Sequence, residues 1–256
     1  MKKPDKKAWF QGGAAVCANP PDPPVGAPWR LVLLGAPGVG KGAQATLLCE
    51  RLGACHLSTG EMLRAASCEG SRVRSPALRT ALANMRKGAL VPDDIMLELV
   101  SLRRHCLRCS GGFVLDGFPR TVAQAEALDV LLGREGLALD AVFDYELPVE
   151  EVVARLAGRR ICPGCGAVYH VTGRPPQRAG ICDACGKRLV QREDDRPEAI
   201  HERMRLYGEN TRPLLDWYGR KGLLVTVPAN GTPDEVYART WISGRTMRAA
   251  AATNGG

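Results

Sequence analysis

The sequence has few aromatic residues and no long apolar run. Phe, Trp and Tyr make up only 5% of the 256 residues, so a hydrophobic core depends mainly on Leu, Val and Ala. No stretch of about 18 apolar residues is present, so we expect no transmembrane helix. Residues 9–13 are too few and too polar for the apolar part of a signal peptide. We therefore expect no membrane association and a cytoplasmic location, where disulfides are rare.

Size and charge restrict the function only broadly. Apolar residues make up 45% of the chain and charged residues 24%, as in soluble globular proteins. The length suffices for one α/β core with inserted subdomains. A formal net charge of +8 favours an anionic partner, such as nucleic acid, an acidic membrane or a polyphosphate. Composition does not choose among these partners, so the choice depends on motifs.

Short apolar runs alternate with helical patterns, and we find no internal repeat. Strands are predicted over 29–34, 112–116, 141–147 and 222–228, and helices over 41–52, 121–132, 149–157 and 196–220. This alternation predicts an α/β fold with a doubly wound parallel sheet. Residues 158–195 are rich in Gly, Cys, Arg and Pro, interrupt the alternation and suggest an inserted lid. Residues 1–28 and 246–256 lack a core pattern, so we expect a flexible extension and a flexible tail.

A glycine-rich loop lies between the first predicted strand and the first predicted helix. It reads Gly35-Ala-Pro-Gly-Val-Gly-Lys41, and its glycines allow backbone N–H groups to turn inward around phosphate oxygens. The following helix presents its positive end to the phosphates, and Lys41 adds a charge for the β- and γ-phosphates. The flanking strand and helix favour a phosphate-binding loop over a chance glycine-rich turn. Gly42 stands where the general motif has Ser or Thr for Mg²⁺.

Two Cys-x-x-Cys pairs fall within the lid segment. Their spacing is typical of a four-thiolate zinc site formed by Cys162, Cys165, Cys182 and Cys185. Such a site has no open coordination position, so the zinc would be structural and would stabilise a lid with little core of its own. The alternatives are unligated thiols or a disulfide. Cys106 and Cys109 form a third pair, which we interpret as structural because no second pair lies nearby.

Five motifs resemble those of the adenylate kinase family, in the family's order and with similar spacing. They lie at 35–42, 58–64, 115–120, 158–160 and 192–195. The resemblance covers about residues 30–245, and the long lid is similar to that of the long-form enzymes. It implies a P-loop nucleotide kinase, commonly monomeric, that uses MgATP and AMP to form two ADP. It also implies a core of residues 29–57, 92–157 and 196–245, an AMP-binding subdomain of 58–91 and a zinc lid of 158–195.

The resemblance further implies roles for individual residues. The phosphoryl-transfer residues would be Lys41, Asp116, Arg120, Arg159, Arg192 and Arg203. ATP would contact Gly35, Gly38, Gly40, Lys41, Gly42, Ala43, Arg155, Val168, Tyr169 and Thr232. AMP would contact Thr59, Arg64, Ala89, Leu90, Val91, Gly117, Arg120, Gln124, Arg192 and Arg203. Arginines suit this chemistry because the guanidinium group forks onto phosphates and stays charged.

Three carboxylates complete the set of candidates. Asp116 ends a predicted strand, from which a carboxylate reaches Mg²⁺ through water, although the following Gly117 also permits interpretation as a turn aspartate. By resemblance, Asp194 and Asp195 would contact lid arginines rather than act as acids or bases. No general base is required, because the attacking AMP phosphate is already anionic.

Ala43 departs from the family pattern, which has threonine at this position. Loss of a hydroxyl contact to phosphate predicts weakened donor binding, but not inactivity, because backbone N–H groups supply most of the cradle. The alternatives are a UMP/CMP kinase, a GTP-using relative, a non-catalytic nucleotide-binding scaffold and a zinc-ribbon nucleic-acid-binding protein. Thr121, Gln124 and the long lid favour AMP. The basic residues fall at phosphate-transfer positions, so we expect no nucleic-acid partner.

Overall fold

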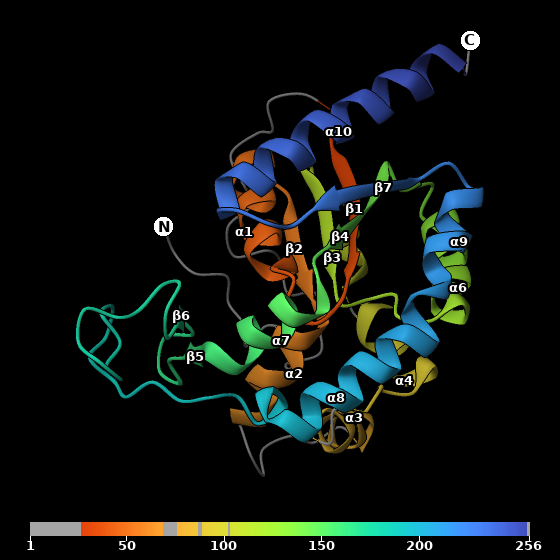
Figure 1. Ribbon diagram of the computed structural model, residues 1–256. Helices are drawn as coiled ribbons and strands as arrows, with labels where there is room; N and C mark the ends of the chain where they lie inside the picture. The colour runs from red at the N-terminus through yellow and green to blue at the C-terminus, as the bar shows by residue number, and fades with distance from the viewer. Residues whose placement is uncertain (1–26, 69–75, 87–88, 102, 255–256) are drawn as a thin grey trace.

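A parallel sheet of five strands forms the centre of the chain (Figure 1). The computed structural model describes residues 27–68, 76–86, 89–101 and 103–254. The strand order is β2-β3-β1-β4-β7, with β1 at Trp29–Gly35, β2 at Cys55–Ser58, β3 at Gly112–Asp116, β4 at Ala141–Glu146 and β7 at Leu224–Pro228. Every neighbouring pair is parallel, so the carboxyl ends of all five strands lie at one edge of the sheet.

Helices cover both faces of this sheet. They are α1 Lys41–Leu52, α2 Thr59–Cys68, α3 Pro76–Arg86, α4 Asp93–Ser101, α5 Arg104–Leu107, α6 Val122–Arg134, α7 Val149–Gly158, α8 Pro197–Leu206, α9 Pro213–Arg220 and α10 Pro233–Asn254. Figure 1 shows α1 and α10 on one side of the sheet and α6 and α9 on the other. Within the described residues, none of these helices is both long and apolar enough to cross a membrane.

The side chains of the central strand, β1, contribute to two hydrophobic core layers, one on each face of the sheet. The β1 sequence is almost continuously apolar, as expected for a strand that is buried on both faces. Val32 and Leu34 pack into a core cluster shared with α2, α3, α4, α6 and α9. Leu31 and Leu33 point the other way and join residues of α1, α7, α8 and α10. The predicted doubly wound α/β fold is therefore confirmed.

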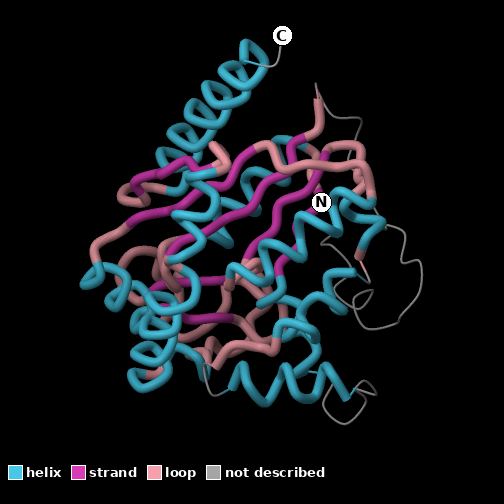
Figure 2. The backbone as a smooth tube through the Cα atoms, turned by 90° about the vertical axis from the view of Figure 1, so that its right-hand side faces the viewer, coloured by secondary structure: helices cyan, strands magenta, loops and turns pink. Residues whose placement is uncertain are grey.

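Residues between α7 and α8 leave the sheet and form a small separate hairpin. Strands β5 (Arg159–Ile161) and β6 (Val168–His170) pair antiparallel, and isolated bridges at Ile161–Val190 and Ile181–Arg188 extend this unit. Figure 1 shows it projecting from the core on the side of the carboxyl ends of the strands, and Figure 2 shows the strands of the sheet running side by side. The chain returns to α8 through the short helical turn η3 (Glu193–Asp195).

Several predicted elements differ in detail from the structure. The predicted strands and the helix at 41–52 are present, but β2 was not predicted, because its four residues Cys-His-Leu-Ser carry no branched or aromatic run. The single helix predicted over 196–220 is wrong: a π-turn, η4 (Tyr207–Thr211), and Pro213 divide it into α8 and α9. The proline has no N–H to continue the helical ladder.

The prediction of a flexible tail from residue 246 is also wrong up to Asn254, since this segment continues α10. Consecutive alanines at 249–252 favour helix without needing a core pattern. Met247 packs against the core, and the Arg248 guanidinium lies 3.4 Å from the ring centroid of Trp29 and 2.8 Å from Asp140. The predicted N-terminal extension falls almost wholly on residues 1–26, outside the described residues.

Candidate functional site

The glycine-rich loop forms a turn between β1 and α1 at the carboxyl edge of the sheet. Gly35, Gly38 and Gly40 have φ values of 127°, 92° and 105°, a region that other residues rarely adopt. A Cβ on Gly35 would lie 2.5 Å from the carbonyl oxygen of Tyr145, so glycine is also required by space. The loop therefore curls over the first turn of α1, where unpaired backbone N–H groups and the helix dipole favour an anion.

Lys41, the first residue of α1, folds back over this loop. Its Nζ donates to the carbonyl oxygens of Gly35 at 2.6 Å and Ala36 at 2.9 Å. Burial lowers the pKa of Lys41 from 10.5 to about 8, and the carboxylate of Asp116 opposes this shift. Within the part of the chain that the structure describes, no carboxylate forms an ion pair with this ammonium group, so a bound polyphosphate would stabilise its charge.

Asp116 ends β3 beside the start of α1. Its Oδ2 accepts a hydrogen bond from Ser58 Oγ at 3.3 Å and lies 3.8 Å from His56 Nε2. A Cβ added to Gly42 would come within 3.7 Å of the same oxygen. The missing side chain at Gly42 therefore leaves room between the helix and the carboxylate. Carboxylate oxygens are the ligands that Mg²⁺ prefers, so this arrangement fits the metal that accompanies ATP.

Arg203 of α8 and Arg159 of β5 meet over a buried carboxylate. Asp195, which is fully buried, binds Arg159 through both of its oxygens, with Arg159 Nε 2.7 Å from Oδ2, and lies 3.3 Å from Arg203. Asp194 lies 3.1 Å from Arg203. Burial lowers the pKa of Arg203 to about 10, and the carboxylate of Asp194 opposes this shift. Asp195 therefore contacts a lid arginine, Arg159, as predicted, whereas the contact of Asp194 is with Arg203 of α8.

The electrostatic interactions connect this cluster to the loop. The charge of Lys41 interacts with those of Arg120 and Arg203, and the charge of Arg203 with those of Arg120 and Arg159. Arg192, at the start of η3, is half-buried, and its carbonyl oxygen accepts the N–H of Asp195 at 3.1 Å. One site therefore gathers cations from the loop, the β3–α6 connection, the hairpin and α8, which suits a highly charged polyphosphate.

Both the backbone and the side chain of Arg120 form hydrogen bonds that fix its position. Its Nε donates to the carbonyl oxygen of Gly117 at 2.9 Å, and its N–H donates to Gln124 Oε1 at 2.8 Å. Thr211, in the π-turn η4, donates to the Arg120 carbonyl oxygen at 3.0 Å. Sequence reasoning did not single out Thr211, and no local signal marks it, because its partner lies 91 residues away.

The predicted AMP contacts lie mostly around the ends of β2 and β3. Thr59 Oγ1 donates to Gly117 O at 3.0 Å and is almost fully buried. The Gln124 amide is occupied by protein groups, because its Nε2 donates to Asp93 Oδ1 at 2.6 Å. Ala89 and Leu90 are half-buried, whereas Val91 packs in the core. Arg64 belongs to α2, but its side chain lies outside the described part of the structure.

The predicted ATP-base contacts separate into two groups. Arg155 of α7 lies beside the loop, with guanidinium nitrogens 3.4 Å from the Val39 carbonyl oxygen and 3.3 Å from that of Ala229. Thr232 stands at the exposed start of α10 and binds Glu235. In the hairpin, Val168 is exposed, but the Tyr169 side chain is buried among the cysteines. The Tyr169 ring packs inside the hairpin, and its contact with ATP stays a prediction.

Asp144 is an acid that the sequence reasoning passed over. It lies within β4 and is only 1% exposed to solvent. Its Oδ1 has no hydrogen-bond partner among the described residues. Burial raises the pKa of Asp144 to about 6, with Glu146 adding to the shift and Lys41 opposing it. It lines a cleft of about 700 Å³ together with Ala36 and Val39 of the loop. The sequence signal that could have identified Asp144 is an acidic residue within an otherwise mostly apolar strand.

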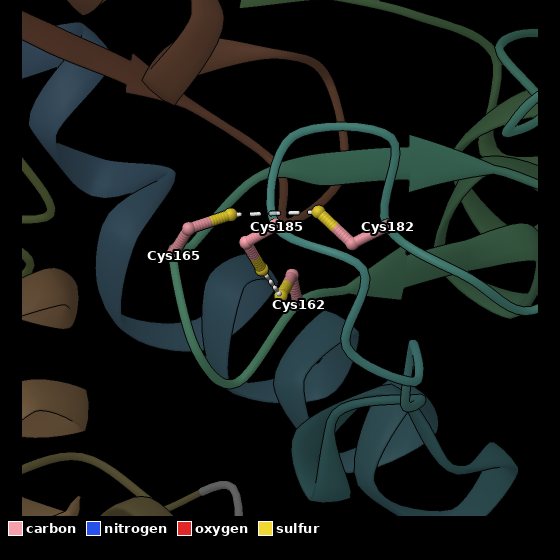
Figure 3. A group of neighbouring side chains, drawn as sticks. All are labelled: Cys162, Cys165, Cys182 and Cys185. Atoms are coloured by element: carbon pink, nitrogen blue, oxygen red, sulfur yellow. Dashed lines mark hydrogen bonds between the residues drawn. The ribbon is translucent and has the colours of Figure 1, made fainter.

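The four cysteines of the hairpin converge as predicted (Figure 3). Their Sγ atoms all lie within 4.8 Å of one another, with 3.3 Å between Cys162 and Cys185 and 3.5 Å between Cys165 and Cys182. These separations exceed the S–S bond length of about 2.05 Å. For a tetrahedral zinc with Zn–S distances of about 2.3 Å, neighbouring sulfurs lie about 3.8 Å apart. The cluster therefore fits a four-coordinate metal ion.

Comparison with known proteins agrees with this geometry. A family model described as adenylate kinase matches residues 33–223. The adenylate kinase of Caldicellulosiruptor bescii is 50% identical over 196 residues, which cover 77% of this chain and 89% of that protein. The adenylate kinase of Streptomyces griseus is 46% identical over 211 residues, covering 82% of this chain and 94% of that protein. The chain therefore belongs to the adenylate kinase family of nucleoside monophosphate kinases, which transfer a phosphoryl group reversibly between ATP and AMP.

Proposed function

We propose that Lys41, Arg120, Arg159, Arg192 and Arg203 surround the transferring phosphoryl group in this adenylate kinase. The observation that supports this most is the mutual electrostatic coupling of Lys41, Arg120 and Arg203 at the carboxyl edge of the sheet. Phosphoryl transfer spreads negative charge over several oxygens, and fixed cations stabilise that charge in the transition state. The chain needs no general base, because the attacking oxygen of AMP is already anionic.

The donor nucleotide would bind with its phosphates over the loop from Gly35 to Ala43 and its base against Arg155. Backbone N–H groups would hold the β- and γ-phosphates, and Lys41 would leave its carbonyl partners to meet them. Asp116 would hold Mg²⁺ through water, and Mg²⁺ supplies neutralising charge to the phosphate oxygens when it is bound. We prefer ATP over GTP as donor.

The acceptor AMP would bind beside the carboxyl ends of β2 and β3. Arg64 and Arg120 would hold its phosphate, and Thr59 and Gln124 would contact the base. Gln124 would have to exchange its present bond to Asp93 for the adenine edge, which an amide can do because it offers both a donor and an acceptor. The segment Ala89–Val91 would close over the ribose and base through backbone groups.

Closure of the subdomains would complete this site. Residues 158–195 form the proposed lid and 58–91 the proposed AMP-binding subdomain, and their movement would exclude water and bring Arg159 and Arg192 to the phosphates. Asp195 anchors Arg159 at the base of the lid. Opening of the lid to release product would then limit turnover.

We further propose that Cys162, Cys165, Cys182 and Cys185 hold a structural zinc ion. The hairpin has a core of only a few side chains, so metal ligation would supply much of its stability. Removal of zinc by a chelator, verified by metal analysis, should therefore lower the melting temperature of the protein. An unchanged melting curve after verified removal would contradict a structural role. Thiolate ligation suits the reducing cytoplasm, where we place this monomeric protein.

The activity test compares acceptors and donors directly. Purified protein is mixed with MgATP and AMP, CMP or UMP, and formation of ADP is measured; GTP then replaces ATP. We expect AMP and ATP to be preferred. Faster turnover with CMP or UMP would reassign the acceptor, and faster turnover with GTP would reassign the donor. Absence of turnover with every pair would support the scaffold alternative that Ala43 suggests.

A further inference from the structure

The two cysteine pairs form two turns, a first knuckle at 162–165 and a second knuckle at 182–185. Tyr169 lies between these knuckles, and its hydroxyl group points into the cluster. The side chain comes from β6, is only 7% exposed and packs against Cys162 and Cys182. Its oxygen lies 2.9 Å from the backbone nitrogen of Asp183 and 3.6 Å from Cys182 Sγ. These two contacts connect β6 to the second knuckle.

The direction of both hydrogen bonds follows from a count of protons. The backbone N–H of Asp183 can only donate, so the Tyr169 oxygen accepts there. The hydroxyl proton is then available for the second contact, and Cys182 Sγ is the acceptor in reach. A metal-bound thiolate carries no proton, so in that state the tyrosine is the donor of an O–H···S⁻ bond.

We propose that Tyr169 is a positioning residue for the metal centre, which orients the Cys182 thiolate by hydrogen bonding and thereby retains the ion. This inference depends on the proposed zinc site. Partners that hydrogen-bond to metal ligands fix ligand orientation and restrict exchange. The burial pattern agrees, because Cys162 and Cys182 are buried, whereas Cys185 is exposed. Tyr169 closes the buried side of the cluster, and solvent reaches the ligands from the side of Cys185.

The role gives the Tyr169 side chain a function that does not depend on bound nucleotide. Its ring and its hydroxyl are both directed into the hairpin, where the hydroxyl contacts Cys182. The hydrogen bond also joins Cys182 to β6, and β6 pairs with β5, which begins at Arg159. Metal retention and the position of this arginine are therefore mechanically connected.

The test compares Tyr169→Phe with a matched control, Tyr145→Phe. The first variant keeps the ring and removes only the hydroxyl. Tyr145 is also buried and also donates its proton, because Thr240 Oγ1, 3.2 Å away, donates its own to the Val236 carbonyl oxygen. Tyr145 belongs to β4, so its variant loses a comparable hydrogen bond in the core, remote from the cysteines.

Metal content of the wild-type protein is measured first, and it tests the zinc site itself. Zinc affinity is then measured for all three proteins by competition with a chromophoric chelator. We expect Tyr169→Phe to bind zinc about 10–100-fold more weakly and Tyr145→Phe to match the wild type. Co²⁺ substitution gives a second readout: loss of the hydrogen bond raises the energy of the thiolate electrons, so the sulfur-to-cobalt charge-transfer band should move to longer wavelength in Tyr169→Phe alone.

Each failure has a distinct meaning. A wild-type protein that retains no zinc would refute the proposed metal site. A zinc-loaded wild type with equal zinc affinity in Tyr169→Phe would refute the role of Tyr169 alone. An unchanged charge-transfer band would likewise refute the hydrogen bond to the thiolate, even if zinc were lost faster, because the effect would then come from packing.

Discussion

The buried carboxylate of Asp195 offers the sharpest test of how the arginines are placed. Replacement by asparagine keeps the shape and one acceptor oxygen but removes the negative charge between Arg159 and Arg203. Asp195 is 0% exposed, and each arginine side chain is 19% exposed, so water compensates little for the loss. We therefore expect both the stability and the rate to fall in Asp195→Asn.

The magnitude follows from the environment of the pair. Breaking a buried ion pair by removal of one partner costs about 3–5 kcal/mol, and the remaining acceptor places this case near about 3 kcal/mol. For a chain of this size, each kcal/mol lowers the melting temperature by about 2–4 °C, so the fall should be about 6–12 °C. Displacement of a charge-stabilising group by about 1 Å can reduce the rate by about 100-fold, and we expect a loss of this order in kcat.

The assay measures kcat with MgATP and AMP well below the melting temperature of each variant, together with a calorimetric melting curve. The control is Asp140→Asn, because Asp140 also binds an arginine, Arg248 at 2.8 Å, and accepts the N–H of Arg30 at 2.7 Å. Asp140 directly precedes β4, so it lies at the amino edge of the sheet, opposite to the carboxyl edge that holds the site. The control should lose stability but keep kcat. A destabilised Asp195→Asn with an unchanged kcat would refute a positioning role and leave only a structural one.

Three further outcomes are expected. Ala43→Thr should lower KM for ATP, and the inference of weakened donor binding fails if KM for ATP and kcat are both unchanged. Because the pKa of Lys41 is about 8 without ligand and phosphate favours its charged form, ATP binding should take up a proton above pH 8 and weaken as the pH rises further. Calorimetry in buffers of different ionisation enthalpy measures this uptake; Lys41→Arg, which stays charged, should show none, and equal uptake in both proteins would assign the proton elsewhere. Arg155→Ala should raise KM for ATP by about tenfold through loss of cation–π stacking, with KM for AMP unchanged; an equal rise in both would contradict a place at the donor base.

Local patterns were sufficient for the parts of the site that depend on short segments. The phosphate loop needs only a strand, glycines with positive φ and a helix start, and all of these are visible between Trp29 and Leu52. The cysteine cluster needs only two short turns of correct spacing, and the four sulfurs do converge. Spacing was sufficient in both cases because the residues that form each unit lie close together in the sequence.

Contacts between distant segments could not be predicted in this way. Thr211 supports Arg120 because the π-turn η4 crosses the β3–α6 connection, and the charge of Asp144 reaches Lys41 because β4 pairs with β1. The direction of the Tyr169 side chain depends on how the two knuckles fold against β6. No local periodicity encodes which face of a hairpin a tyrosine occupies.

The sequence alone determined the α/β alternation, the phosphate loop, the four-cysteine cluster and the family to which the chain belongs. These depend on backbone conformation, periodicity and spacing, which are local properties. Tertiary structure alone decided which charges meet. It buried Asp195 between Arg159 and Arg203 and turned the Tyr169 hydroxyl toward Cys182. Burial changes the energy of a charge or hydrogen bond more than its sequence neighbours do, and burial is set only when distant segments pack.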